Sequence, residues 1–332
     1  MGSEAIQQQL FTLIKSKIAS HQSLSDVVCE LLGISADSAY RRIRGEKPLS
    51  PDELKKLCTT FHISLDRLFN ISSGSTLFQT EYLNKNRPDF LSYLKSILEI
   101  QKTLAQMPDA KIYVDAKDIP PFYYYGFEML STFKFYVWMR FTGQIDSAEP
   151  LSFEEDELNK ELLVTSKEIM KVHATIPSVE IWNAETINST LRQIDFYVES
   201  GVIKEKKIAQ QLLQQLKELV MRLEKQVEFG KKFPYGSAEN NTGAEYSFFV
   251  NGVFLGDNCM MAEAKGATKV FVSHGILDFM VADDERFVAA TKKSFENIMR
   301  KSSLISVVNE RERVKFFKEM KNKIELASDK FQ

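Results

Sequence analysis

Arginine and hydroxyl side chains gather in one short stretch of the chain, SADSAYRRIRGEK, between Ser35 and Lys47. An Arg guanidinium can bond a guanine edge bidentately, and a Ser hydroxyl can bond a base edge or a phosphate. Residues 41–47 hold four basic side chains against one acid, Glu46. These residue types in this order indicate double-stranded DNA as a partner. The candidate DNA-contacting residues are Ser35, Asp37, Ser38, Tyr40, Arg41, Arg42, Arg44 and Lys47.

The residues around this stretch predict the helices that must position it. Gly33 can end one helix at positive φ without a Cβ penalty. Ser35 can cap the next helix, residues 36–44, because its hydroxyl accepts a free N–H of the first turn. On that helix a narrow apolar stripe is expected to pack inward: Ala36, Ala39 and Ile43. The polar residues then lie on the opposite face, with Tyr40 and Arg42 on its flanks.

A second capping signal, Ser50-Pro51-Asp52-Glu53, restarts the helix pattern after the basic stretch. It combines an N-cap residue, a Pro at the first helical position and acids in the first turn. The apolar stripe of this helix is Leu54, Leu57, Cys58 and Phe61. An opening helix at 4–20 and a last short helix after Ser64 complete the pattern. Residues 1–70 are therefore predicted to form an all-α domain of five helices.

The segment LLGIS…RRIRGEKPLSPDELKKLCTTFHISLDRLF resembles the lambda-repressor/Cro-like helix-turn-helix family. The resemblance covers roughly residues 5–70, and it implies that the third helix enters the major groove. Two positions depart from the family pattern: Ala36 replaces the usual Gln, and the acidic Asp37 follows it. Residues 1–70 hold nine Lys/Arg and eight Asp/Glu. Attraction to phosphates must therefore come from a local patch, doubled in a dimer.

The length of 332 residues suggests more than one domain. Ile71-Ser72-Ser73-Gly74-Ser75-Thr76 is small, polar and typical of a linker. We predict a helix-turn-helix domain at residues 1–70, a linker at 71–80 and a second domain, the body, at 81–332.

The body shows helix and strand patterns that predict an α+β fold, with an antiparallel sheet framed by helices. Three turn signals are expected to join its last four strands in a meander: Asn251-Gly252, Lys265-Gly266 and His274-Gly275. This architecture is compatible with a PAS- or GAF-like sensor module. Strands are expected at 111–114, 179–182, 246–251, 253–262, 268–274 and 277–282. Helices are expected at 88–106, 127–141, 152–173, 184–199, 203–229, 284–300 and 310–327.

The longest predicted helix, residues 203–229, carries leucines spaced three and four apart. This seam fits a helix that packs on its own domain, and it also fits a short coiled coil between two copies. Aromatic residues of the body leave a similar choice. They fit a packed core, or they line an effector pocket, for which the candidates are Tyr123, Tyr125, Trp138 and Trp182.

The sequence lacks the residue patterns that are typical of metal binding, catalysis and nucleotide binding. The four histidines do not have metal-ligand spacing, and the three cysteines form no CxxC pair, so we expect no metal and buried free thiols. His274, near Ser273 and Asp278, is read as a turn residue rather than a general base. No Gly-rich nucleotide loop is present and no Ser–Lys dyad can be assigned. We therefore expect no enzyme activity and no cofactor.

Charge and hydropathy limit the remaining classes. The net charge of −2 excludes a generally basic nucleic-acid coat. No basic leader precedes an apolar run, and no run approaches the roughly 20 apolar residues that span a bilayer. We expect a cytoplasmic protein with no membrane partner.

Together these patterns predict a bacterial-type, sequence-specific transcriptional regulator. Residues 36–44 would read the major groove, and the body would form a homodimer and sense a small-molecule or protein effector. The alternative is an adaptor that binds another protein and has no specific DNA site.

Overall fold

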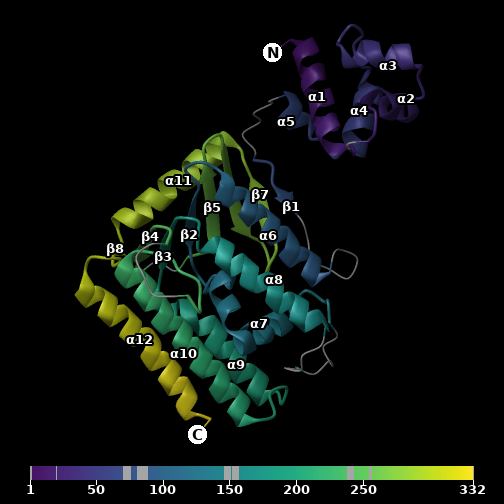
Figure 1. The fold of residues 1–332 in the computed structure, drawn as a ribbon. Coiled ribbons are helices and arrows are strands. Elements are labelled where there is room, and N and C mark those ends of the chain that lie inside the picture. The colour runs from purple at the N-terminus through teal and green to yellow at the C-terminus, as the bar shows by residue number, and fades with distance from the viewer. Residues whose placement is uncertain are drawn as a thin grey trace. The chain divides into compact units, whose positions relative to one another are not determined.

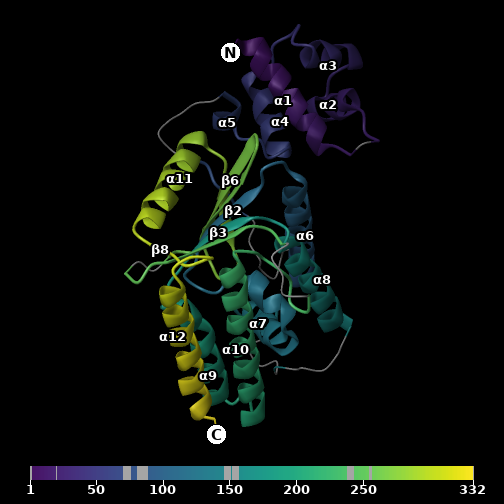
Figure 2. The ribbon, with the colours of Figure 1, turned by 60° about the vertical axis from the view of Figure 1, so that its left-hand side comes forward.

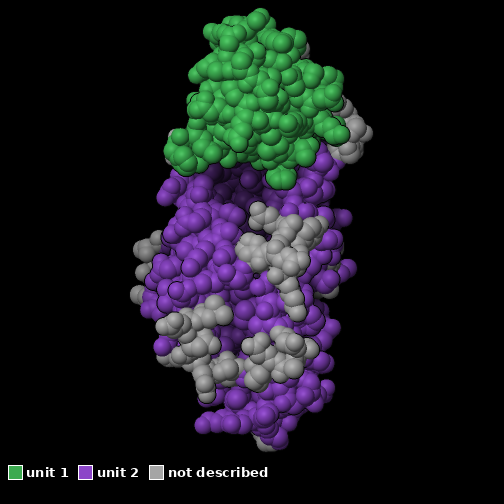
Figure 3. All heavy atoms as spheres, turned by 90° about the vertical axis from the view of Figure 1, so that its right-hand side faces the viewer, with its two compact units in different colours: residues 1–75 green, residues 76–332 purple. Residues whose placement is uncertain are grey.

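The computed structural model describes residues 2–19, 21–69, 76–80, 89–145, 151, 157–237, 243–253 and 256–331. The chain divides into two compact units, residues 1–75 and residues 76–332, which are drawn in different colours in Figure 3. Each unit has its own hydrophobic core and is described by itself.

The first unit is all-α, as predicted. Its described helices are α1 (Ser3–Lys17), α2 (Leu24–Leu32), α3 (Ala36–Ile43), α4 (Pro51–Thr60) and α5 (Leu65–Phe69). Apolar residues from all five helices form one core: Leu10, Phe11, Ile14, Val28, Ala39, Leu57, Cys58 and Leu68. Ala39 is fully buried, so α3 packs closely on its neighbours and its other face stays free.

The second unit is built on an eight-stranded sheet with the order β1-β7-β6-β5-β2-β3-β4-β8. The pairs β2–β3 and β3–β4 are parallel and the other pairs are antiparallel. The sheet is therefore mixed, whereas the sequence predicted an antiparallel one. The strands are β1 (Gln79–Thr80), β2 (Lys111–Asp115), β3 (Ser178–Trp182), β4 (Tyr246–Val250), β5 (Cys259–Ala264), β6 (Ala267–Ser273), β7 (Phe279–Ala282) and β8 (Ser303–Leu304).

Helices cover both faces of this sheet (Figures 1 and 2). On one face α11 packs Phe295 against Ile181, Met261 and Val270. The other face carries the large core shared by α6, α8, α10 and their neighbours. The helices are α6 (Phe90–Gln106), α7 (Glu128–Phe141), α8 (Glu157–His173), α9 (Asn188–Glu199), α10 (Lys206–Phe229), α11 (Glu285–Arg300) and α12 (Glu310–Asp329), with 3₁₀ turns η1 (Pro121–Gly126) and η2 (Ala184–Ile187). In the described part of the chain, no helix has both the length and the apolar character that crossing a membrane requires.

Two of the three predicted hairpin turns are confirmed. The Lys265-Gly266 turn joins β5 to β6, with Gly266 at φ 81°, and the His274 N–H bonds the Asp278 carbonyl oxygen at the turn between β6 and β7. The turn at Asn251-Gly252 is wrong, because β2 and β3 lie between β4 and β5 in the sheet. Asn251 is instead buried, and its carbonyl oxygen accepts a bond from the Asn183 amide at 2.8 Å.

Several predicted boundaries also move. Residues 71–75 of the predicted linker and residues 152–156 of a predicted helix lie outside the described residues. Gln79–Thr80, also placed in the predicted linker, pair with β7 at the edge of the sheet. The strand expected at 253–262 is described as β5, which begins only at Cys259.

The leucine seam of α10 lies inside the second unit. Leu212, Leu216, Leu219 and Leu223 are each at most 2% exposed and belong to the main core. Of the two alternatives, the structure shows the helix packed on its own domain, so a dimer would use another surface.

Candidate nucleic-acid interface

The turn between α2 and α3 is closed by the two caps that the sequence predicts. Gly33 has φ 67°, and its N–H and that of Ile34 both bond the Cys29 carbonyl oxygen, at 2.9 and 3.2 Å. This is the glycine end of a helix that only a residue tolerant of positive φ makes easily. The Ser35 hydroxyl accepts the Ser38 N–H at 3.4 Å and so begins α3. The two serines also bond each other through their hydroxyls at 3.2 Å.

One face of α3 projects away from the core of the first unit. We call it the recognition face, and it consists of Asp37, Tyr40, Arg41 and Arg44. These positions are three or four apart, which places them on one side of a helix. Tyr40 is 51% exposed, and the side chains of Arg41 and Arg44 are 52% and 61% exposed. Lys47 is exposed just beyond the helix, while Ser38 is half-buried.

Glu46 pairs with both arginines of the recognition face. Its carboxylate lies 3.1 Å from Arg44 Nε and 3.9 Å from Arg41 Nε. Exposed ion pairs contribute little to stability, so phosphates or bases can replace this carboxylate at small cost. Asp37 lies in the first turn of α3, where the helix dipole favours an acid.

Arg42 is the predicted DNA contact that the structure places elsewhere. Its side chain is 7% exposed and bonds the Glu53 carboxylate with two nitrogens, at 2.7 and 3.2 Å. A third nitrogen bonds the Ser38 carbonyl oxygen at 3.2 Å. Arg42 therefore fastens α3 to the start of α4 and does not belong to the recognition face. Ala36, expected in the inward stripe, is exposed, because the first residue of α3 lies beside the turn.

Glu53 is held ionised by this arrangement. It completes a capping box with Ser50, whose N–H bonds Glu53 Oε2 at 2.9 Å. Burial alone raises the pKa of Glu53, but the bonds from Arg42 and from the Ser50 backbone outweigh it, so the pKa lies below its usual value. The ion pair is thus complete at neutral pH.

Gln7 is a positioning residue that sequence reasoning missed. Its amide donates to the Arg42 and Lys47 carbonyl oxygens at 2.6 and 2.8 Å, and its oxygen accepts the Leu49 N–H at 3.0 Å. The side chain therefore ties α1 to the backbone just after the recognition face. It lies in the run Gln7-Gln8-Gln9, where nothing distinguishes it from its neighbours.

The four aromatic residues proposed for an effector pocket do not surround one cavity. Tyr125, Trp138 and Trp182 are at most 5% exposed and belong to the main core. Tyr123 lines a pocket, and its hydroxyl bonds the buried Glu180 carboxylate at 2.7 Å. Trp182 Nε1 bonds the same carboxylate at 2.9 Å.

Metal and thiol chemistry find no site among the described residues. No group of three or more His, Cys, Asp or Glu side chains in this part of the chain is arranged to hold a metal ion. Cys29, Cys58 and Cys259 are free thiols, but only Cys58 of these three is buried as expected, and the other two are partly exposed.

The capped turn, the five-helix core and the projecting face of α3 define a helix-turn-helix-type domain at the N-terminal end of the chain. Residues 3–87 match the family model described as the BetR domain. This match suggests a DNA-binding regulator of the helix-turn-helix type, and the finer resemblance to the lambda-repressor/Cro-like family stays a prediction. Comparisons with curated proteins and with solved structures found nothing that matches this chain.

Proposed function

We propose that the chain is a bacterial-type, sequence-specific regulator of transcription that binds double-stranded DNA as a homodimer. In this proposal α3 enters the major groove, and the body dimerises and senses a ligand or a partner. The proposal includes no catalytic activity, cofactor or metal, and it places the protein in the cytoplasm, where it meets DNA.

The recognition face carries this proposal. Tyr40, Arg41 and Arg44 are exposed side by side on a short helix whose other face is buried. Arg42 and Gln7 hold that helix and the following loop in place by hydrogen bonds. A rigid helix with exposed arginines is what base recognition in a groove requires.

A dimer is proposed because one such domain buries little surface on DNA. Single DNA-binding modules cover about 600–1,000 Å², whereas specific sites at physiological salt usually take more. Two copies related by a two-fold axis would read two half-sites one helical turn apart, about 34 Å.

The test is selection of random duplexes by the purified full-length chain, followed by sequencing. We expect enrichment of a short motif with two-fold symmetry. The Arg41→Ala/Arg44→Ala variant should lose the enrichment, while the control variant Arg300→Ala, an exposed arginine on α11, should keep it. Random sequences after several rounds would overturn the proposal.

The adaptor alternative remains because Glu46 already pairs with both arginines of the recognition face. It predicts weak binding to all duplexes alike and no enriched motif. Under this alternative Glu46→Gln leaves DNA binding equally unspecific, whereas under the regulator proposal it strengthens binding to the selected site.

A further inference from the structure

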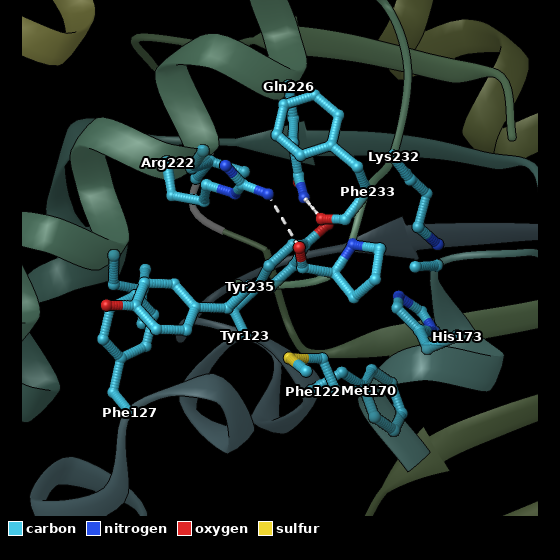
Figure 4. A pocket seen from close by; sticks show the side chains of 14 residues that line it. Phe122, Tyr123, Phe127, Met170, His173, Arg222, Gln226, Lys232, Phe233 and Tyr235 are labelled. Atoms are coloured by element: carbon cyan, nitrogen blue, oxygen red, sulfur yellow. Dashed lines mark hydrogen bonds between the residues drawn. The ribbon is translucent and has the colours of Figure 1, made fainter. Parts of the chain in front are cut away.

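A small pocket in the body brings polar side chains together in a way that the packing of the chain does not explain (Figure 4). This inner pocket lies between η1, α8, α10 and residues 232–235, and its cavity measures about 30 Å³. Lys232 and His173 lie on one side of it, and Phe127 and Tyr235 lie at the other end. The remaining walls include Phe122, Met170 and Gln226.

His173 has no hydrogen-bond partner for either ring nitrogen among the described residues, although it is 4% exposed. Burial, reinforced by the charge of Lys232, lowers the pKa of His173 well below its usual range. The ring is therefore neutral, with one N–H donor and one acceptor. Gln226 Oε1 is a third buried polar atom without a partner in the described chain. Buried polar atoms are nearly always paired, so three at one cavity indicate a missing polar group.

Lys232 adds donors to the same cavity. Its side chain is buried, and among the described residues its ammonium bonds one carbonyl oxygen, that of Ile176 at 3.0 Å. An ammonium has three N–H donors, so the bonding capacity of Lys232 is not filled. The neighbouring donors of Lys232 and His173 call for an acceptor with several lone pairs, which is the chemistry of a carboxylate.

The chain's own buried carboxylate does not fill this role. Tyr123 and Ser178 bond one oxygen of Glu180 on β3, and Trp182 and Tyr246 bond the other. These four donors satisfy Glu180 without Lys232 or His173. Among the described residues, therefore, no carboxylate accepts from both Lys232 and His173, and a ligand can supply one.

A wider hollow continues from the inner pocket to the surface. This outer hollow has a volume of about 400 Å³ and shares Phe127, Met170 and Tyr235 with the inner pocket. The Phe127 and Tyr235 rings stand between the two, with centroids 4.3 Å apart. The close approach needs Gly126, since a Cβ there would lie 2.5 Å from the Cβ of Tyr235.

We propose that the inner pocket binds the carboxylate of a small organic acid, with Lys232 and His173 donating to its oxygens and the rest of the acid reaching past Phe127, Met170 and Tyr235 toward the outer hollow. This inference rests on the proposed function in that it gives the sensing body a site and a ligand class. Gln226 Oε1 accepts from a donor next to the carboxylate, if the acid has one. Tyr235 must turn outward to admit the ligand.

The probes are phenylacetate and butyrate, each compared with its uncharged amide, phenylacetamide or butyramide. Binding to the full-length chain is measured by calorimetry and by the thermal unfolding midpoint, without DNA. We expect both acids to bind and to raise the midpoint. The amides should bind at least about tenfold more weakly, because they lack the charge that strengthens these hydrogen bonds.

His173→Phe separates binding from folding. Phenylalanine keeps the stacking on Phe122, whose ring centroid lies 4.3 Å from that of His173. Because the two nitrogens have no partners among the described residues, their removal should not lower the unfolding midpoint, while acid binding should weaken at least about tenfold. Lys232→Met should weaken it likewise. The matched control Lys318→Met, an exposed lysine on α12 that lines neither pocket, should leave acid binding unchanged.

Three results would each overturn the inference: no binding of either acid at millimolar concentration, equal binding of acids and amides, or loss of binding with Lys318→Met and not with Lys232→Met. Gly126→Ala provides a second readout, since it displaces Tyr235 and should speed acid association.

DNA selection and acid binding are measured separately. Failure of one therefore leaves the other standing.

Discussion

At the scale of single residues, the arginines of α3 divide into two roles. Arg41 and Arg44 are exposed and pair with Glu46, whereas Arg42 is buried and bonded to Glu53. Three arginines within four positions thus differ because the helix turns them toward different surroundings. The difference decides which substitutions should affect DNA binding and which should affect folding.

Arg41→Ala should weaken binding to the selected DNA site by about 1–3 kcal/mol if Arg41 reads a base. Arg41→Lys keeps the charge but loses the bidentate geometry, so it should relax specificity more than it lowers affinity for random duplexes. Fluorescence anisotropy with the selected and a scrambled duplex measures both effects. Unchanged affinity for the selected site would remove Arg41 from the interface.

Arg42→Ala should destabilise the first unit by about 2–4 kcal/mol, because it leaves the Glu53 carboxylate without its main partner in a partly buried place. Hydrogen exchange of the α3 and α4 amides in the full-length chain measures this loss. The loss should shrink as the pH falls below the pKa of Glu53, which the Arg42 pair holds below its usual value. If Arg42→Ala leaves hydrogen exchange unchanged but weakens DNA binding, Arg42 contacts DNA and the prediction is wrong.

The role of a residue can be predicted from the sequence when its partners are near in the chain. The positive φ of Gly33 and the cap at Ser35 depend on neighbours within a few positions, and both were predictable. The burial of Arg42 depends on Glu53, eleven positions away, and the role of Gln7 depends on Arg42, thirty-five positions away. Helical periodicity predicts on which side of a helix a side chain lies. It does not predict which other element packs against that side.

At the scale of elements, the turn between α2 and α3 sets the direction of the recognition face. Gly33 has open space around an added Cβ, so substitution there would act through its φ of 67° alone. Gly33→Ala should therefore lower the stability of the first unit by about 1 kcal/mol.

Gly33→Asn serves as the matched variant, since Asn tolerates this conformation better and should cost less. Chemical denaturation of the full-length chain, followed by exchange of the α2 and α3 amides, ranks the two. An equal loss of stability for both variants would mean that the added side chain clashes with a neighbouring group.

The sheet shows why local signals predict hairpins but not strand order. The turns at Gly266 and Gly275 join strands that are adjacent in both sequence and sheet, so turn residues sufficed to predict them. The parallel strands β2, β3 and β4 come together across the long helices between them, and a buried strand has the same apolar pattern in either direction. The hairpin signal at Asn251-Gly252 was misleading, because Asn251 serves the buried bond to Asn183.

At the scale of the whole molecule, charge should control DNA binding through a local patch. The chain has a net charge of −2, so our proposal assigns the attraction to DNA to a local patch, Arg41, Arg44 and Lys47. Each neutralised phosphate contributes about −0.9 to the slope of log affinity against log salt concentration. We expect a slope of about −5 for a dimer and about −3 for a monomer, measured on the selected duplex. A slope near zero would contradict phosphate contact by these residues.

The stability of the body should rise between pH 7 and pH 9. Burial lowers the pKa of both Lys134 and Lys232 to about 7. In the unfolded chain both lysines keep their protons up to about pH 10.4, so the unfolded state binds more protons in this window. The free energy of unfolding therefore rises with pH there.

Lys134→Met and Lys232→Met should each raise the thermal unfolding midpoint at pH 7. In the double variant, the midpoint should increase less between pH 7 and pH 9 than it does in the parent chain. Scans of the full-length chain at several pH values, with Lys171→Met as an exposed control, measure this. A midpoint that falls between pH 7 and pH 9 in the parent chain would show that other groups dominate.

The pairing of β1 with β7 also limits the length of the segment that connects the two units. The chain leaves α5 at Phe69 and is fastened to the sheet at Gln79, so residues 70–78 span at most about 30 Å when fully stretched. This reach is comparable to the 34 Å between two half-sites on DNA.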